Sequence, residues 1–252
     1  MKRTSFAAVF ALLLASAFFC LGSKPLAAEP RALSGSEHLA QADVHLNASY
    51  KQIKKLYASD AQFLEKLKNS QRAWLKFRDA ELDALFPHAK EDPSYYGSIY
   101  NEARAEWAAV LEDERMTQLD KWVKAAAKGK DNFYPYAFMN PQQKTFGTAK
   151  KAYTLEELAE ANETVLNSNY QRIVKDKAYA DDKLFIKKLR NAQRAWLKFR
   201  DAEIETLVPR GKNDRARLFA GAQLTKDRSR QLLKWITGVS EGDVYAGSIK
   251  FK

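Results

Sequence analysis

The segment QRAWLKFRDAE occurs twice in this chain, at residues 71–81 and again at residues 193–203. Eleven identical residues in a row do not recur by chance, so the chain holds two copies of one module. The likeness continues on both sides, where FLEKLKNS matches FIKKLRNA, LNASYKQI matches LNSNYQRI and QLDKWV matches QLLKWI. The offset between matched segments drifts from 120 to 122 to 113 residues, and insertions of this kind belong in loops.

The first copy of the module predicts three helices. Apolar and small residues at helical spacing predict a helix over about 36–58. A second helix is predicted over about 60–86, capped by its first aspartate and stopped by the proline that follows it. An Asp-Pro pair predicts the start of a third helix over about 92–127.

The second copy repeats this plan. Thr154 and Glu157 form a capping-box pattern ahead of the fourth helix. The fifth and sixth helices are predicted over about 182–208 and 214–237. Since no alternation of polar and apolar residues is long enough to predict a strand, the predicted fold class is all-α: two tandem three-helix bundle-like units joined by an aromatic-rich linker.

These patterns divide the chain into five segments. They are a signal peptide (1–28), the first helical unit (36–127), the linker (128–153), the second helical unit (154–237) and a tail (238–252). The linker carries several aromatic residues, among them Phe133, Tyr134, Tyr136, Phe138 and Phe146. We therefore expect the linker to pack along one of the bundles, because exposed tethers are seldom so aromatic.

The first residues have the layout of a secretory signal peptide. A basic start is followed by an apolar run from Phe6 to Leu21 and by small residues up to Ala28. We expect cleavage near Ala28 and a periplasmic or secreted protein; an uncleaved membrane anchor is the alternative, because the run is almost long enough to span a bilayer. The single cysteine, Cys20, lies in this leader, so cleavage leaves no thiol for a disulfide or a metal site.

The formal net charge of +11 is unevenly distributed. Residues 36–127 carry 13 basic and 15 acidic side chains, which gives −2. Residues 154–237 carry 18 and 12, which gives +6, and residues 128–153 carry 5 and 1, which gives +4. The linker and the second unit therefore favour anionic partners, whereas the first unit is close to neutral.

The repeated polar residues share helix faces, because residues three or four apart lie on one side of a helix. A guanidinium four residues from an indole can stack on it, and its burial requires a carboxylate partner, here Asp43 or Glu163. We predict a semi-buried network of arginine, tryptophan, asparagine, tyrosine and an acid between the first two helices of each unit. A groove for a ligand is the alternative interpretation. The repeated residues are Asn47, Tyr50, Gln71, Trp74, Arg78, Asp79 and Glu81, and then Asn167, Tyr170, Gln193, Trp196, Arg200, Asp201 and Glu203.

This pattern, an LN followed by a tyrosine and then QRAW running into FRDAE, resembles the lysozyme inhibitor LprI-like N-terminal domain family of bacterial envelope proteins, in two tandem copies. The resemblance covers most of the mature chain. It implies small helical exported domains, one branch of which is associated with inhibition of lysozyme. Many members carry a cysteine directly after FRDAE, which the resemblance implies is tied to the third helix. Here Leu82 and Ile204 occupy those places, and we expect an apolar contact instead.

No catalytic motif is recognisable in the sequence. HExxH, GxSxG, P-loop and dinucleotide-binding patterns are absent. The three histidines, His38, His45 and His88, lack a further ligand at metal-binding spacing. We predict no enzymatic activity, no catalytic residue, no metal and no cofactor, and export disfavours nucleic acid as a partner.

The resemblance implies an inhibitor of lysozyme or of another peptidoglycan hydrolase, or a related protein-interaction module. Common animal lysozymes are basic, so a negative surface is expected on the inhibitor. The third helix of the first unit and the 87–97 loop are the candidates for that surface. The acidic residues of that helix are Glu102, Glu106, Glu112, Asp113, Glu114 and Asp120.

An alternative is an envelope-binding module whose basic second unit contacts an anionic glycan or lipid. The cations concerned lie on the last helix, and a plain solvated face is the other interpretation of them. They are Arg215, Arg217, Lys226, Arg228, Arg230 and Lys234. The sequence leaves open the oligomeric state and the packing of the two units on each other.

Overall fold

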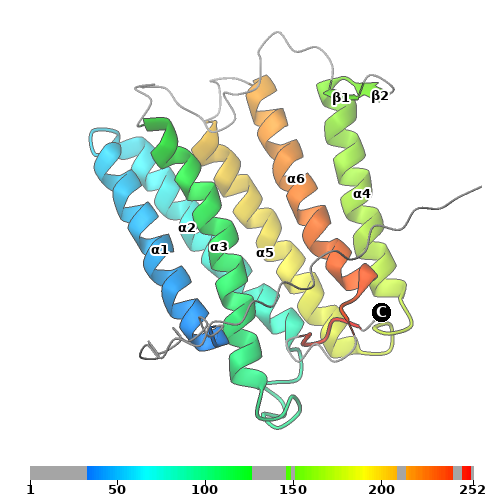
Figure 1. Cartoon of the computed structure of the whole chain (residues 1–252). Coiled ribbons are helices and arrows are strands. Elements are labelled where there is room, and N and C mark those ends of the chain that lie inside the picture. Colours follow the sequence, from blue (N-terminus) through cyan, green and yellow to red (C-terminus); the bar gives the residue numbers. More distant parts are fainter. Residues whose placement is uncertain (1–32, 127–145, 149–150, 209–213, 241–245, 251–252) are drawn as a thin grey trace, which may run out of the picture. The chain divides into compact units, whose positions relative to one another are not determined.

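The structure, a computed structural model, describes residues 33–126, 146–148, 151–208, 214–240 and 246–250. These residues belong to one compact unit, Leu33–Lys252, and contain six helices (Figure 1). The predicted signal peptide and the linker aromatics from Phe133 to Phe138 lie outside the described residues.

The first repeat forms α1 (Gly35–Leu56), α2 (Ala61–Leu85) and α3 (Tyr100–Ala126). Asp60 caps α2 as predicted, since its side chain accepts a hydrogen bond from the amide of Phe63 at 2.9 Å. The predicted start of the third helix at the Asp-Pro pair is wrong. Asp92 accepts hydrogen bonds from the amide and hydroxyl of Ser94, which closes a turn, and the helix begins eight residues later.

The second repeat forms α4 (Leu155–Lys175), α5 (Lys183–Leu207) and α6 (Asp214–Thr237). The predicted capping box is confirmed, because the side chains of Thr154 and Glu157 each accept from the other's backbone amide. Gly238, which follows α6, has a φ of 71°, a left-handed conformation that favours glycine at the end of a helix.

Two short strands in the linker were not predicted. β1 (Phe146–Thr148) and β2 (Lys151–Tyr153) pair antiparallel ahead of α4. Three residues are too few to produce a visible alternation of polar and apolar side chains. The all-α fold with two tandem helical units is confirmed, with this hairpin as an addition.

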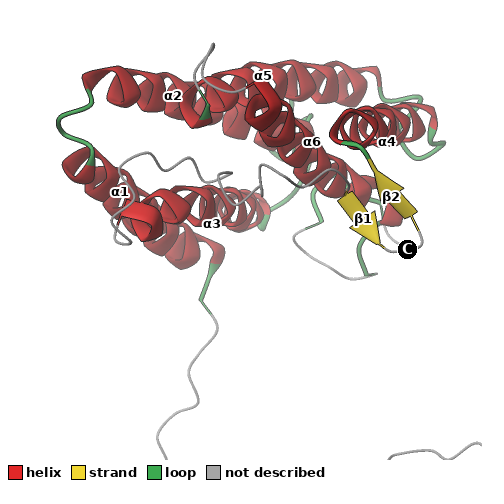
Figure 2. Ribbon diagram, turned by 90° about the horizontal axis from the view of Figure 1, so that it is seen from above, coloured by secondary structure: helices red, strands yellow, loops and turns green. Residues whose placement is uncertain are grey.

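Helices pack in three pairs, α1 with α3, α4 with α6, and α2 with α5. Figure 2 shows α2 and α5 along the upper side of the view, with α1 and α3 below α2. α2 and α5 run antiparallel, as contacts of Lys66 with Glu205 and of Phe77 with Phe199 show. The third helix of each repeat therefore packs on the first, while the second helices of the two repeats pack on each other.

One continuous core spans both repeats. In the first repeat Phe63 and Trp122 lie 4.8 Å apart between ring centroids, and in the second Phe185 and Trp235 lie 5.1 Å apart. These are equivalent positions of the two copies. The duplication is thus preserved in packing as well as in sequence.

Candidate partner-binding surfaces

The repeated segment builds the contact between the two repeats. Arg228 of α6 is buried and donates from both terminal nitrogens to the carboxylate of Glu81 in α2, at 2.9 and 2.8 Å. Its Nε donates to Gln193 at 3.1 Å. Its Cζ lies 5.0 Å from the ring centroid of Phe77. Gln193 belongs to the same repeat as Arg228, whereas Glu81 and Phe77 belong to the other.

Arg115 of α3 makes the equivalent contacts in the opposite direction. Its Nη2 donates to Glu203 of α5 at 3.0 Å, and its Nε donates to Gln71 at 3.0 Å. Its Cζ lies 5.1 Å from the ring centroid of Phe199. The hydroxyl of Ser70 also donates to Glu203. The two arginine–glutamate pairs therefore cross from one repeat to the other.

Both crossed pairs are enclosed. The two arginine side chains are 0% exposed, and their glutamate partners are 4% and 7% exposed. Between the pairs, the rings of Phe77 and Phe199 stack with centroids 6.1 Å apart and an angle of 2°. Because a buried charge without its partner is strongly destabilising, this arrangement fixes how one repeat sits on the other.

Arg78 forms the predicted contact with an indole. Its Cζ lies 5.6 Å from the ring centroid of Trp74, and its side chain is 24% exposed. The buried acid is Glu112 of α3, which accepts from Arg78 at 2.8 Å, and not the predicted Asp43 of α1. Burial raises the pKa of Glu112, and the charge of Arg78 opposes that rise.

Arg200 repeats this geometry in the second copy. Its Cζ lies 5.2 Å from the ring centroid of Trp196, and its Nη1 donates to Glu163 of α4 at 2.7 Å, as predicted. Asp79 and Asp201 are 60% and 69% exposed, and each accepts from the arginine that precedes it. Their role, which the sequence left open, is to pair with that arginine at the surface.

The asparagines do not join this network. Asn47 and Asn167 are exposed, so their predicted place between the first two helices is wrong. The reason is that α1 and α4 turn their buried faces toward the third helices. Tyr50 and Tyr170 are partly buried at the edge of the core.

Several acidic residues of α3 are engaged within the first repeat. Glu102 accepts from the amide and the hydroxyl of Ser36. The two ring nitrogens of His38 lie 3.0 Å from a carboxylate oxygen of Glu106 and 3.0 Å from one of Asp113. Hydrogen bonds to these two acids raise the pKa of His38 above its ordinary 6.5.

The remaining acidic residues of α3 also accept hydrogen bonds from, or are buried against, other parts of the protein. Asp120 accepts from the hydroxyl of Ser49 at 2.6 Å, and Glu114 accepts from Gln231 of α6 at 2.7 Å. Glu112 is 2% exposed, so its assignment to a partner surface is wrong. The acidic side chains predicted as a free face are therefore engaged in hydrogen bonds within the protein, and most of them remain partly exposed.

The basic residues of α6 do not share one exposed face either. Arg228 is buried in a crossed pair, so its assignment to an anion-binding surface is wrong. Arg217 is partly buried and donates to Glu205 at 3.1 Å and to the carbonyl of Val208. Arg215 is partly buried as well.

The other three cations of α6 are exposed. They are Lys226, Arg230 and Lys234. Arg230 pairs with Asp227 at 3.4 Å, and the Nζ of Lys234 lies 5.4 Å from the ring centroid of Trp107. Three cations, two of which already have contacts, make a weak anion site.

The two repeats differ most in the number of residues between their second and third helices. Fourteen residues separate Leu85 from Tyr100, whereas six separate Leu207 from Asp214 in the second repeat. The loop lies at the lower ends of α2 and α3 in Figure 1. Residues 90–95 and 97–99 are exposed. This loop contains the 87–97 segment that the sequence singled out.

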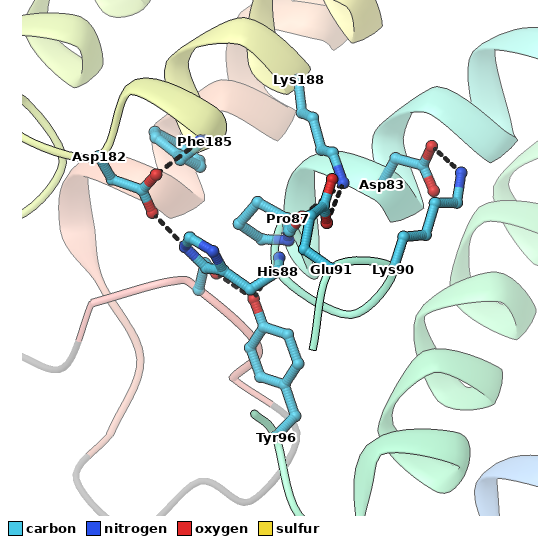
Figure 3. Close-up of polar contacts among 10 residues, drawn as sticks. Asp83, Pro87, His88, Lys90, Glu91, Tyr96, Asp182, Phe185 and Lys188 are labelled. Carbon is cyan, nitrogen blue, oxygen red and sulfur yellow. Dashed lines mark hydrogen bonds and ion pairs between the residues drawn. The ribbon is translucent and has the colours of Figure 1, made fainter. Parts of the chain in front are cut away.

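The base of the loop is braced against α5 of the second repeat (Figure 3). The Nε2 of His88 lies 2.7 Å from a carboxylate oxygen of Asp182. The Nζ of Lys188 donates to the carbonyl of Pro87 and, at 3.2 Å, to Glu91. The loop is therefore tied to both repeats.

Two tyrosines of the loop, Tyr95 and Tyr96, contact its base at His88. The hydroxyl of Tyr96 accepts from the amide of His88 at 3.4 Å and lies 3.2 Å from the hydroxyl of Ser248. Tyr95 stacks on His88 with centroids 4.5 Å apart and is still 58% exposed. Gly97 has a φ of 67°, which an L side chain rarely adopts, so the turn requires glycine.

The described residues line two small cavities and one open groove of about 490 Å³ beside Arg172, Lys175 and Lys250. Two cavities beside α3 and α6 measure about 20 Å³ each, which is room for one water molecule. Among the described residues, no group of three histidine, cysteine or acidic side chains is placed to hold a metal. None of the described helices is both long and apolar enough to cross a membrane.

Family comparison identifies both repeats. The model of the family described as lysozyme inhibitor LprI matches residues 28–119 and 139–232, which together are more than half of the chain. The chain belongs to the lysozyme inhibitor LprI family. No curated protein and no solved structure matches it.

Each LprI match contains one copy of the segment that joins the repeats, together with Arg115 or Arg228. At the places where the resemblance to other members implies a cysteine, this LprI chain has apolar packing. Leu82 is 2% exposed. Ile204 is partly buried and packs against the core.

Proposed function

We propose that this chain is an exported, non-catalytic inhibitor of a lysozyme-type peptidoglycan hydrolase. The observation that carries the proposal is the match of both repeats to the lysozyme inhibitor LprI family. Export is supported by the basic start, apolar run and small residues up to Ala28. An anion-binding role for α6, the alternative, has little support because Arg228 and Arg217 are engaged internally.

We further propose that the α2–α3 loop makes the inhibitory contact. Glycoside hydrolases act in a cleft that carries two carboxyl groups, so a protein inhibitor needs a projecting element that reaches it. The loop is exposed at residues 90–95, and its base is held by His88 and Lys188. A braced loop loses less conformational entropy on binding than a free one.

Two exposed side chains suit this role. Tyr95 offers a large ring together with a polar hydroxyl, the combination that is enriched in protein interfaces. Hydrogen bonds from the hydroxyl and the amide of Ser94 lower the pKa of Asp92, which keeps that carboxylate charged. A fixed negative charge favours association with a basic hydrolase.

The test is inhibition of peptidoglycan hydrolysis by the compact unit, residues 33–252, with animal and bacterial lysozymes at low and high salt. Loss of a central aromatic anchor at an interface costs about 2 kcal/mol or more. We therefore expect Tyr95→Ala to raise the inhibition constant about thirtyfold or more. Asp92→Asn is expected to slow association, with a smaller effect at high salt.

Matched controls are Val165→Ala and Glu160→Gln, since both residues are exposed on α4, away from the loop. Both variants are expected to inhibit like the unmodified protein. If the unmodified protein inhibits no lysozyme at low salt, the proposed function is contradicted. If it inhibits but the loop variants do so equally well, only the assignment of the loop is contradicted.

A further inference from the structure

Three repeated residues remain without a role in the packing. The contacts above account for the glutamine, tryptophan, phenylalanine, second arginine, aspartate and glutamate of QRAWLKFRDAE. The first arginine, the leucine and the lysine are exposed in both repeats. They are Arg72, Leu75 and Lys76 on α2, and Arg194, Leu197 and Lys198 on α5.

Exposed positions nearby have diverged between the two copies. Glu65 corresponds to Lys187, and Lys68 corresponds to Arg190. Surface substitutions have small effects on stability, so exposed positions in duplicated segments are free to differ. Five exposed positions stayed identical, namely 69, 72, 75, 76 and 79 with their counterparts 191, 194, 197, 198 and 201. The aspartates pair with the preceding arginine, whereas Arg72, Leu75 and Lys76 and their counterparts have no contact within the described residues that explains their retention, which indicates a function at the surface.

The same face of α5 carries a continuous line of cations. Their spacing of four, three, four and four residues places them on one side of the helix. All five are exposed, and within the described residues none of them forms an ion pair. They are Lys183, Lys187, Arg190, Arg194 and Lys198. At 1.5 Å per residue the line extends over roughly 22 Å.

The cations of α2 lie on the same side of the protein. α2 and α5 pack antiparallel at Phe77 and Phe199, and Arg115 of α3 and Arg228 of α6 each lie over one of these rings. Figure 2 shows the backbones of α1 and α3 below α2, and the exposed residues of α2 and α5 are those turned away from the neighbouring helices. We call this the outer face: Lys68, Arg72, Leu75 and Lys76 of α2, and Lys183, Lys187, Arg190, Arg194, Leu197 and Lys198 of α5. Three exposed acids share it: Glu65 pairs with Lys68 at 3.2 Å, and Asp79 and Asp201 pair with the arginines that precede them, so cations remain in excess.

We propose that the outer face binds the anionic phospholipid surface of a membrane. Its cations are spread over two adjacent helices, which suits many phosphates in a plane better than one anion in a pocket. Lysine and arginine stems can lie along apolar surface while their charges stay in the headgroup region. Leu75 and Leu197, each 37% exposed, add apolar contact among these charges. This inference does not depend on lysozyme inhibition.

The test uses residues 33–252, a compact unit with its own core, so that the apolar leader cannot bind lipid itself. Binding is measured by co-sedimentation with vesicles of phosphatidylcholine, with and without phosphatidylglycerol. We expect binding to the anionic vesicles only, and weaker binding at high salt.

The variant combines Lys187→Gln, Arg194→Gln and Lys198→Gln. Each cation near such a surface contributes about fivefold, so the partition coefficient should fall about a hundredfold.

The control combines Lys51→Gln, Lys55→Gln and Lys226→Gln, three exposed cations outside the outer face. It removes the same net charge and should bind nearly as well as the unmodified protein. A second variant, Lys183→Gln with Arg190→Gln, replaces the first if thermal unfolding shows the first to be misfolded. The proposal would be overturned if the partition coefficient fell equally in variant and control. It would also be overturned if the unmodified protein bound neutral and anionic vesicles equally. Binding to a soluble anionic glycan such as heparin without binding to vesicles would overturn it too.

Discussion

Arginine side chains at equivalent places in the two repeats hold different parts of this protein together. Arg78 and Arg200 stack on an indole and pair with an acid inside their own repeat. Arg115 and Arg228 are fully buried and pair with a glutamate of the other repeat. The planar guanidinium, with five donors, suits both arrangements, because it can stack and form several hydrogen bonds at once.

The crossed pairs make a clear prediction at the residue scale. Glu81→Ala leaves the buried charge of Arg228 without its carboxylate, so the free energy of unfolding should fall by about 3–5 kcal/mol. Asp79→Ala, two residues earlier in the same segment, removes an exposed pair and should cost less than about 1 kcal/mol. Denaturant unfolding of both variants measures the difference. Equal costs would contradict the assigned roles.

His38 predicts a pH dependence. Its folded-state pKa is raised above 6.5 by Glu106 and Asp113, so the folded protein binds more protons than the unfolded chain in that range. The contribution of His38 to stability is therefore complete below pH 6.5 and is lost as the pH rises through the folded-state pKa. His38→Gln should remove this decline in unfolding experiments across pH. His45→Gln, on the same helix but exposed, is the control and should retain it.

The sequence predicted the contacts within each repeat better than the contacts between repeats. Spacing on one helix brings Arg200 near Trp196, and the need for a carboxylate points to Glu163. Spacing cannot show which helix of the other repeat faces Glu81. One signal was available: Arg115 and Arg228 each precede the matched glutamine by three residues, so they are equivalent.

At the scale of helices and loops, the α2–α3 loop distinguishes the repeats. Asp182 caps α5 by accepting from the amide of Phe185 at 2.8 Å, and it also contacts His88 in the loop. Asp60, at the equivalent place, only caps α2 in the described contacts. Asp182 of the second repeat therefore both caps its helix and contacts the loop, in addition to the capping role that it shares with Asp60.

This difference can be measured by mutation. Loss of an N-cap costs about 1 kcal/mol, so Asp60→Ala and Asp182→Ala share that cost. A double-mutant cycle of His88→Ala with Asp182→Ala should show a coupling of about 0.5–1 kcal/mol, the size of a partly exposed pair. The cycle of His88→Ala with Asp60→Ala is the control and should show none. Coupling absent from both cycles would mean that the loop is not braced through Asp182.

Helix ends were predictable where a capping side chain marks them, as at Asp60, Thr154 and Asp182. The start of α3 was not, because Asp92 and Pro93 suit a turn as well as the first residues of a helix. The face that α1 presents was also missed. Its apolar stripe fits any neighbour, and only the packing shows that the neighbour is α3.

At the scale of the whole molecule, the two repeats share one core and exchange charged partners. Residues that are buried in this contact are not free to bind another protein. The surfaces proposed for function therefore lie elsewhere: the α2–α3 loop for a hydrolase and the outer face for lipid. They adjoin at the start of α5, where Asp182 and Lys188 brace the loop beside Lys183 and Lys187, but Tyr95 and Asp92 of the loop can be replaced without changing a residue of the outer face.

The most direct test of this interlocked arrangement is hydrogen exchange of residues 33–252, followed by mass spectrometry, for Glu81→Ala and the unmodified protein. Because Glu81 of α2 binds Arg228 of α6, we predict faster exchange in both helices, and hence in both repeats. Faster exchange confined to the first repeat, with α6 unchanged, would contradict the account.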